Sequence, residues 1–186
     1  TGGLPNADLL EGSYIPLQAL RRFDPANNAH PALRSDGSFD VDGHGSDWII
    51  QRYLIRRYGI PLFGPPPASL IDPVAPSDLR GAVRGILREW WTPPLPSPQR
   101  FESSHYRAYA VLTMCRALYT LEHADVASKP VAARWALTAL GQPWAGLIED
   151  ALAWQPGADF DAHHQFLDFI LFTLERASSP WTAGAG

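Results

Sequence analysis

The sequence predicts a mainly helical protein, in which a bundle of about six helices follows a short extended arm. Apolar residues recur at helical spacing in several segments, and Pro- and Gly-rich turns separate these segments. With 186 residues, 46% of them hydrophobic, the chain is long enough for a packed core. We therefore divide it into an N-terminal arm, strand and loop over 1–46, a helical bundle domain over 47–177 and a flexible tail over 178–186.

The N-terminal arm contains one predicted strand. Tyr14, Ile15 and Leu17 favour an extended backbone, and Pro16 confines the strand to an edge or a strand end. No partner for this strand is evident, because residues 24–46 are rich in Asp, Asn, Gly, Pro and Ser and are predicted to form a loop. An isolated strand is marginally stable at best, so a homodimer through this strand is one expectation.

The first two helices of the bundle are delimited by their end signals. Asp47 can cap the first helix, and Gly59 stops it. A rigid proline-rich turn covers 60–67. The second helix begins at residue 77 or 78, carries apolar residues at helical spacing, and ends before a second proline-rich loop over 92–100.

The remaining helices follow from periodicity and caps. The longest periodic segment covers 103–122. Ser128 caps the next helix, which has a proline in its tolerated first turn and is broken at Gly141. Another helix covers 144–154, and Asp161 opens a final apolar helix. These segments complete the predicted bundle.

Composition excludes several functional classes. Fifteen Lys and Arg against nineteen Asp and Glu give a net charge of −4, whereas a dedicated nucleic-acid binder is usually basic. No apolar run approaches the ~20 residues that a membrane span needs. A single cysteine, Cys115, excludes an internal disulfide and fits a reducing compartment. We expect a cytoplasmic protein without nucleic-acid or membrane partners.

Two patterns resemble metal sites. Asp40 and Asp42 form a D-x-D pair, which on a strand can hold Mg²⁺ because both carboxylates face one side. No apolar strand flanks the pair, so we interpret it as part of a solvated loop. His163 and His164 are adjacent, diverge by about 100° on a helix, and are interpreted as a surface pair. We expect no metal site in this chain.

The most informative pair of charges is Arg116 and Lys129. Arg116 lies in an otherwise apolar stretch, where a charge needs a partner or a ligand, and Lys129 begins the next helix. A helix N-terminus with a lysine and an arginine facing it can bind an anion or a phosphate. Alternatively, Arg116 pairs with Glu122 or Asp125 and Lys129 is exposed. Local sequence leaves both interpretations open.

Three tryptophan residues lie at helix ends beside loops. Trp90 and Trp91 precede the second proline-rich loop, and Trp154 precedes a Pro-Gly pair. A tryptophan in such a place can stack on a base or a sugar ring. It can equally be a core residue, and the sequence alone does not separate the two roles.

Several runs carry a resemblance to a known family. The segments VLTMCRALYT (111–120), SKPVAARWA (128–136) and LIEDALAW (147–154) resemble the helical C-terminal domain of streptomycin/spectinomycin adenylyltransferases. YGIPLFGP (58–65), followed by IDPV, is similar to a segment of the same domain. LEGSYIP (10–16) resembles the last strand of the nucleotidyltransferase domain that precedes it. The resemblance implies that AMP is moved from Mg²⁺-ATP to a drug hydroxyl.

The resemblance also implies residue roles. Arg116 and Lys129 would contact the nucleotide, Trp154 would pack near the adenosine, and Glu11 would act as general base toward the acceptor hydroxyl. The family has acids in its drug-binding loop, but here Tyr106 stands at the corresponding offset from Arg116. The remaining candidates for contact with the acceptor are Trp90, Trp91 and Glu102.

The resemblance predicts a function, but the sequence departs from the family pattern upstream of Glu11. Only ten residues precede Glu11, whereas the Gly-Ser and D-x-D strand that bind Mg²⁺ in these enzymes should lie upstream of it. We therefore expect a C-terminal domain that binds the nucleotide and a small hydroxyl acceptor, lacks its catalytic nucleotidyltransferase half, and is inactive alone. The alternative is a stand-alone, non-catalytic helical binding module.

Overall fold

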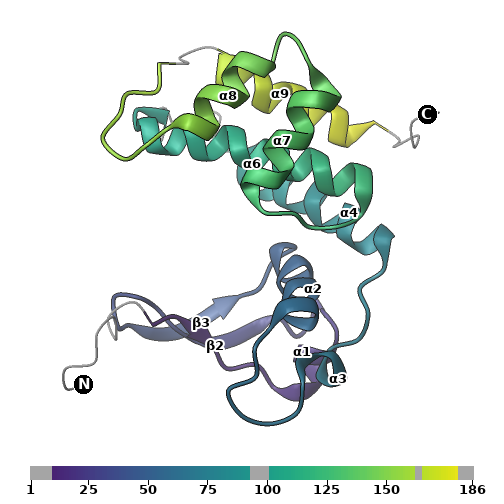
Figure 1. Cartoon of the computed structure of the whole chain (residues 1–186). Coiled ribbons are helices and arrows are strands. Elements are labelled where there is room, and N and C mark those ends of the chain that lie inside the picture. The colour runs from purple at the N-terminus through teal and green to yellow at the C-terminus, as the bar shows by residue number, and fades with distance from the viewer. Residues whose placement is uncertain (1–9, 93–100, 162–164, 180–186) are drawn as a thin grey trace. The chain divides into compact units, whose positions relative to one another are not determined.

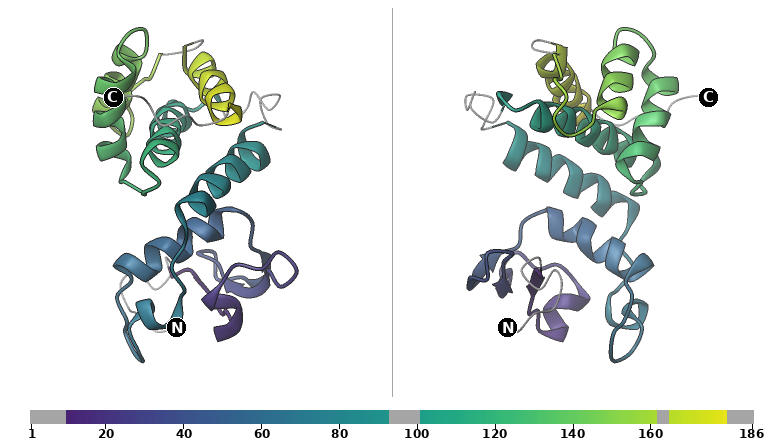
Figure 2. Two further views of the ribbon diagram at one scale, coloured as in Figure 1. Left: turned by 90° about the vertical axis from the view of Figure 1, so that its right-hand side faces the viewer. Right: turned by 60° about the vertical axis from the view of Figure 1, so that its left-hand side comes forward.

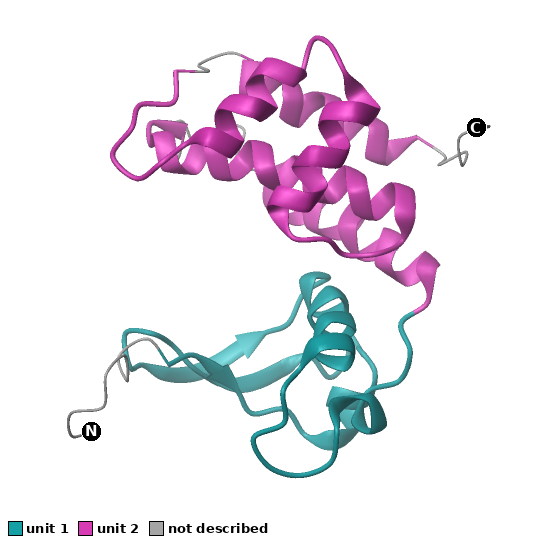
Figure 3. Cartoon of the chain, viewed as in Figure 1, with its two compact units in different colours: residues 1–74 teal, residues 75–186 magenta. Residues whose placement is uncertain are grey.

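The computed structural model describes residues 10–92, 101–161 and 165–179, and it is mainly helical, as the sequence predicts. The chain divides into two compact units, Thr1–Val74 and Ala75–Gly186 (Figure 3). The sequence places a domain boundary at residues 46 and 47, so the first predicted helix, assigned to the bundle, lies in unit 1. Residues 93–100 of the predicted loop over 92–100, the pair His163–His164 and most of the predicted tail lie outside the described residues.

Unit 1, over its described residues 10–74, contains a three-stranded antiparallel sheet and three helices. The sheet order is β1-β2-β3, with Gly12 opposite Leu33 and Leu33 opposite Phe39. The elements are β1 (Gly12–Ser13), α1 (Leu17–Arg21), β2 (Ala29–Leu33), β3 (Phe39–Gly43), α2 (Asp47–Tyr58) and α3 (Pro67–Leu70), as labelled in Figure 1.

Two expectations about the N-terminal region are wrong. Residues 24–46 are not all loop, since β2 and β3 form a hairpin whose turn includes Gly37 at a positive φ of 80°. The N-terminal strand also differs from its prediction: β1 covers Gly12–Ser13 and pairs with β2 of its own chain, whereas Leu17, predicted as part of the strand, begins α1. Asp40 and Asp42 lie on β3 rather than in a loop, and Asp42 is paired with Arg34. Pairing between strands supplies the stability that the local sequence does not show.

Two histidine side chains, His30 of β2 and His44 after β3, are buried side by side in unit 1. His44 is 1% exposed, its ring stacks on Trp48 at 3.4 Å between centroids, and the ring of His30 lies 4.8 Å away. Among the described residues, neither ring nitrogen of His44 has a hydrogen-bond partner. Burial, followed by the positive charges of His30 and Arg52, lowers the pKa of His44 to about 4, and Asp42 opposes this shift.

Unit 1 is therefore expected to lose stability in mild acid. Unfolded histidine binds a proton near pH 6.5, whereas folded His44 does so only near pH 4, so stability falls as pH drops between these values. We expect a loss of about 2 kcal/mol between pH 7 and pH 5. Urea unfolding at pH 7 and pH 5, monitored by amide hydrogen exchange of β2 and β3, measures this loss of stability. The variant His44→Phe should lose this dependence, and the exposed control His123→Gln should keep it; an unchanged profile in His44→Phe would contradict the assignment.

Unit 2 is a helical bundle built around one long helix. Within this unit α6 contacts α4, α7, α8 and α9, and these neighbours surround it in Figure 2. The ends of α6 agree with the predicted segment 103–122 to within one residue. The elements are α4 (Pro76–Ile86), the π-helical turn η2 (Leu87–Trp91), α6 (Ser104–His123), α7 (Lys129–Leu140), α8 (Ala145–Ala153) and α9 (Gln165–Ser178).

The core of unit 2 explains why α6 is central. Val111, Met114 and Leu118 lie on one stripe of the helix at spacings of three and four residues, and each is at most 1% exposed. Phe169 and Ile170 of α9 are also fully buried. Of the helices in the described part of the chain, none has the length and hydropathy needed to cross a membrane.

Candidate functional site

A stripe of polar and aromatic residues follows α6 beside its buried face. Tyr106, Tyr109, Thr113 and Arg116 recur at spacings of three, four and three residues, which places them on one side of the helix. Lys129, the first residue of α7, reaches this stripe, because its Nζ lies 3.6 Å from the centroid of the Tyr109 ring. We call these five residues the α6 stripe.

The two cations of the α6 stripe are close enough to influence each other. Burial, and then the positive charge of Arg116, lower the pKa of Lys129 to about 8. Lys129 is half-buried rather than exposed. The Tyr109 ring face offsets part of the cost of burying its ammonium, since a cation is attracted to the ring quadrupole.

No carboxylate neutralises this pair in the described residues. The Arg116 guanidinium has no hydrogen bond or ion pair to any described side chain, so it is not joined to Glu122 or Asp125. Two neighbouring positive charges without an acid repel each other, and binding of an anion would relieve that repulsion. The arrangement at Arg116 and Lys129 can therefore bind a phosphate-bearing ligand.

Aromatic rings pack along the α6 stripe. Trp91 of η2 is buried, at 7% exposure, and its ring lies 6.2 Å from that of Tyr106 with 25° between the planes. Tyr106 in turn stacks with Tyr109 at 5.8 Å and 26°. Trp91 also lines a small cavity of about 50 Å³ together with Thr113 and Arg116. Trp91 is thus a buried residue that lies next to Tyr106 and lines the same cavity as Arg116.

Trp154 lies beside His105, which in turn lies near Tyr109 of the α6 stripe. Its Nε1 donates a hydrogen bond to the carbonyl oxygen of Ala158 at 2.9 Å, which fixes the indole at the end of α8. The ring of His105 lies 5.5 Å from Trp154 and 6.5 Å from Tyr109. Trp154 therefore borders the α6 stripe through His105, and among the described residues it makes no contact with Arg116 or Lys129.

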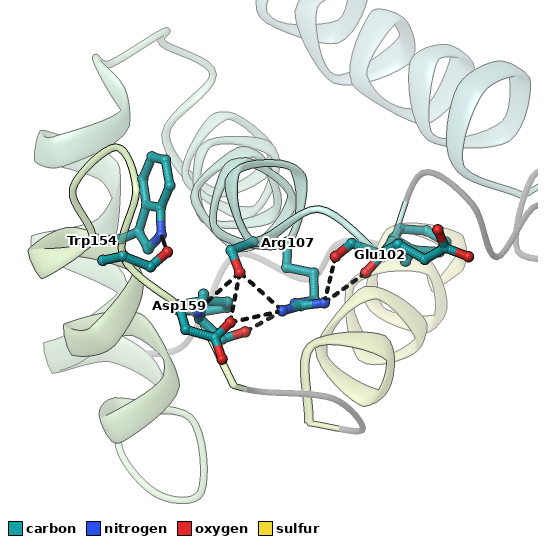
Figure 4. Close-up of polar contacts among 8 residues, drawn as sticks. Glu102, Arg107, Trp154 and Asp159 are labelled. Atoms are coloured by element: carbon teal, nitrogen blue, oxygen red, sulfur yellow. Dashed lines mark hydrogen bonds and ion pairs between the residues drawn. The ribbon is translucent and has the colours of Figure 1, made fainter.

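The start of α6 is held by Arg107, a residue that the sequence did not single out. Its guanidinium donates to the carbonyl oxygens of Phe101, Glu102 and Phe160 at 2.9, 3.1 and 2.9 Å, and to the Ser104 hydroxyl at 3.1 Å. Asp159 lies 3.5 Å away, and Figure 4 shows Arg107 between the Glu102 turn and the Asp159 segment. One signal could have revealed it: Arg107 occupies the stripe of α6 that is otherwise apolar.

The other predicted site residues, Trp90, Glu102 and Glu11, are exposed. Trp90 is 58% exposed and has no ring partner among the described residues. Glu102 accepts from Arg107 through its backbone, and its side chain is exposed. Glu11 is exposed and precedes β1 in unit 1, whereas the α6 stripe belongs entirely to unit 2. The structure thus brings together Arg116 and Lys129, with Trp91 and Trp154 at the border.

Comparison with known proteins identifies the class. The family model for the C-terminal domain of aminoglycoside adenylyltransferases matches residues 69–169, more than half of the chain, and the chain belongs to this family. The resemblance seen in the sequence is therefore confirmed.

A solved structure gives a particular relative. The chain is similar in fold to the spectinomycin adenyltransferase AAD(9) from Enterococcus faecialis, solved with ATP and spectinomycin, with a TM-score of 0.67 and 15% sequence identity. The match covers 91% of this chain and 68% of that one. No curated protein sequence matches the chain.

Proposed function

We propose that this chain is the nucleotide- and acceptor-binding part of an adenylyltransferase that transfers AMP from ATP to a hydroxyl group. The observation that carries the proposal is the pair Arg116 and Lys129, two neighbouring cations that no described carboxylate neutralises. Membership of the family and a fold shared with an enzyme solved with ATP support it. Arg116 and Lys129 are proposed to hold the triphosphate, and Trp154 to pack near the adenosine.

The proposed transfer of AMP needs cations at the phosphates and a base at the acceptor hydroxyl. The acceptor oxygen bonds to the α-phosphorus of ATP, the bond to the bridging oxygen breaks, and pyrophosphate leaves with its electron pair. Cations at the phosphates stabilise the charge that builds up on them. A base takes the hydroxyl proton, and by family resemblance Glu11 is proposed for that role.

Magnesium is not assigned to residues of this chain. In the described residues, no group of three or more His, Cys, Asp and Glu side chains could hold a metal ion. Asp42, the better placed acid of the D-x-D pair, is already paired with Arg34. We therefore propose that the metal ligands belong to a separate nucleotidyltransferase domain, and that this chain binds ATP without transferring AMP.

Removal of the ammonium tests the nucleotide site. We expect Lys129→Ala to bind ATP about tenfold more weakly than the wild type, because one charge-assisted contact to phosphate is lost. Isothermal titration of ATP into the chain at low salt measures the affinity. The matched control is Arg134→Ala, an exposed cation on the same helix, which should bind as the wild type does. Equal affinities for Lys129→Ala and the wild type would refute the site.

The pH dependence of the same titration provides a second measurement. Since the pKa of Lys129 is about 8, its charge is present at pH 7 and mostly lost at pH 9, whereas the triphosphate is ionised throughout this range. Affinity of the wild type should therefore fall as pH rises from 7 to 9. The variant Lys129→Arg remains charged and should show a flatter profile. A wild-type profile that is flat over this range would contradict a role for the Lys129 ammonium.

A further inference from the structure

We propose that unit 2 has a second ligand site, which binds a small organic carboxylate with an apolar body in the cavity between η2 and the last turn of α9. The cavity has a volume of about 760 Å³, a size typical of small-molecule sites. None of the five residues of the α6 stripe lines it, and it shares only Leu87 with the small cavity beside Arg116. Its ligand is therefore distinct from the nucleotide and the acceptor of the proposed function.

One wall of the cavity is the π-helical turn η2. Leu87 and Arg88 belong to this turn, and Thr92 follows it directly. The backbone N–H and the hydroxyl of Thr92 both donate to the carbonyl oxygen of Leu87, at 3.1 and 3.2 Å. A single π-helical turn is rare in proteins and is found frequently at functional sites. The irregular turn therefore lies where a binding surface is expected.

Three arginines recur every four residues along α4 and η2, and their partners differ. Arg80 donates to two carbonyl oxygens in the last turn of α6, at 2.8 and 3.1 Å. Arg84 donates through its Nε to the carbonyl oxygen of Ala177 in the last turn of α9, at 2.9 Å. Arg88 is exposed and has no hydrogen bond or ion pair to any described residue. The first two arginines hold helix ends, whereas the third is available to a ligand.

The two arginines that line the cavity keep most of their donors for a ligand. Within the described residues Arg84 uses only its Nε, and its bond to Ala177 holds the guanidinium in place while both Nη groups remain without a partner. Side chains four residues apart on a helix are neighbours, so Arg84 and Arg88 can approach the same anionic group. The planar fork of a guanidinium matches the two oxygens of a carboxylate.

The charges of the lining favour a ligand with a single negative charge. Arg84 and Arg88 are positive, and Glu175 is the only acid among the described residues that line the cavity. Glu175 has no ion pair there, so two positive charges face one negative charge that neutralises neither guanidinium. The hydroxyl groups of Ser178 and Ser179 donate to carbonyl oxygens of α9, which reduces the repulsion of an anion by this helix end.

The apolar part of the lining requires more than an inorganic ion. Leu87 and Ala177 are 3% and 4% exposed, and Leu174 is half-buried beside them in the same lining. Covering apolar surface is favourable by about 25 cal/mol per Å². An inorganic anion would leave this surface in contact with water, whereas an aromatic or aliphatic body attached to the carboxylate would cover it.

A direct test titrates three probes into the isotope-labelled full chain at low salt. The probes are 4-phenylbutyrate, its neutral analogue 4-phenyl-1-butanol, and inorganic phosphate. Amide chemical shifts report both the affinity and the place of binding. We expect 4-phenylbutyrate to bind at least about tenfold more tightly than either other probe, with the largest shift changes in η2 and the last turn of α9. Equal binding of phosphate would indicate an adventitious ion only, and that result, like shift changes elsewhere or no binding, overturns the proposal.

The variant Arg88→Gln removes one charge from the cavity while keeping a polar side chain. Because Arg88 is exposed and unpaired in the described residues, the fold should be unaffected. Affinity for 4-phenylbutyrate should fall about tenfold. The matched control is Arg134→Gln on α7, another exposed arginine, which should bind as the wild type does. In Glu175→Gln the negative charge is lost, so 4-phenylbutyrate should bind more tightly. Equal affinities for Arg88→Gln and the wild type would contradict the assignment.

The same variants separate this site from the nucleotide site. Lys129→Ala should leave the affinity for 4-phenylbutyrate unchanged, and Arg88→Gln should leave the affinity for ATP unchanged, because the two residues line different parts of unit 2. Saturating ATP should not displace the probe. If Lys129→Ala weakens binding of 4-phenylbutyrate, or if ATP competes with it, the probe occupies the nucleotide site and the proposal of a second site is wrong. Loss of ATP binding alone would leave the second site intact.

Discussion

Replacing Arg107 by methionine is expected to lower the free energy of unfolding of unit 2 by roughly 3 to 4 kcal/mol. The side chain is 3% exposed and donates to three carbonyl oxygens and one hydroxyl. Methionine fills most of the same volume but donates nothing. The carbonyl of Phe160 would then be left without this donor in a buried position, and each such loss costs about 1 to 3 kcal/mol.

Urea unfolding monitored by far-ultraviolet circular dichroism measures this effect. The control is Arg134→Met on the exposed side of α7, which should change the free energy of unfolding by less than about 0.5 kcal/mol. An Arg107→Met variant as stable as Arg134→Met would show that the contacts of the guanidinium contribute little.

Replacing Arg52 by methionine is expected to destabilise unit 1 by about 3 kcal/mol. Its guanidinium is buried in unit 1 and donates to the carbonyl oxygens of Ala19 and Leu20 in the last turn of α1. It also donates to the carbonyl of Trp48, and its Cζ lies 5.9 Å from the centroid of the Trp48 ring. Burial lowers the pKa of this guanidinium, but an arginine stays charged at any ordinary pH.

Amide hydrogen exchange in α1 and α2 reports this loss separately from unit 2. The exposed arginine Arg22, which pairs with Asp72 on the surface, gives the matched control Arg22→Met, and its cost should stay below about 1 kcal/mol. We expect faster exchange throughout unit 1 in Arg52→Met and unchanged exchange in α6. Slowed or unaltered exchange of α1 would contradict the role of Arg52 as the cap of that helix.

The helical part of the fold could be predicted because its signals are local. The apolar period of α6 and the Ser-Lys-Pro start of α7 lie within a few residues of the elements they define. The strands β2 and β3 could not be predicted in the same way. Their stability depends on pairing between Ala29–Leu33 and Phe39–Gly43 and on the burial of His30 and Ala32 against the rest of unit 1, and neither appears in a short window.

The candidate site was partly visible in the sequence. Arg116 is a charge on an apolar stretch, and Lys129 is the only lysine of the chain, so both stand out. The contact of Lys129 with Tyr109 was not visible, because the two residues lie twenty positions apart on different helices. Arg107 was overlooked for a related reason: its main partner, the carbonyl of Phe160, lies 53 positions away in the chain.

The sequence by itself therefore determined the helical class of the protein, most helix ends and the identity of its conspicuous cations. Only the tertiary structure decided what each arginine does: Arg107 and Arg52 hold buried carbonyl groups, whereas Arg116 acts through its charge on Lys129 and has no ion pair within the described residues. The physical reason is how far apart in the sequence the interacting residues lie. Helix formation depends on neighbours within one or two turns, whereas burial and charge pairing depend on residues that folding brings together from distant parts of the chain.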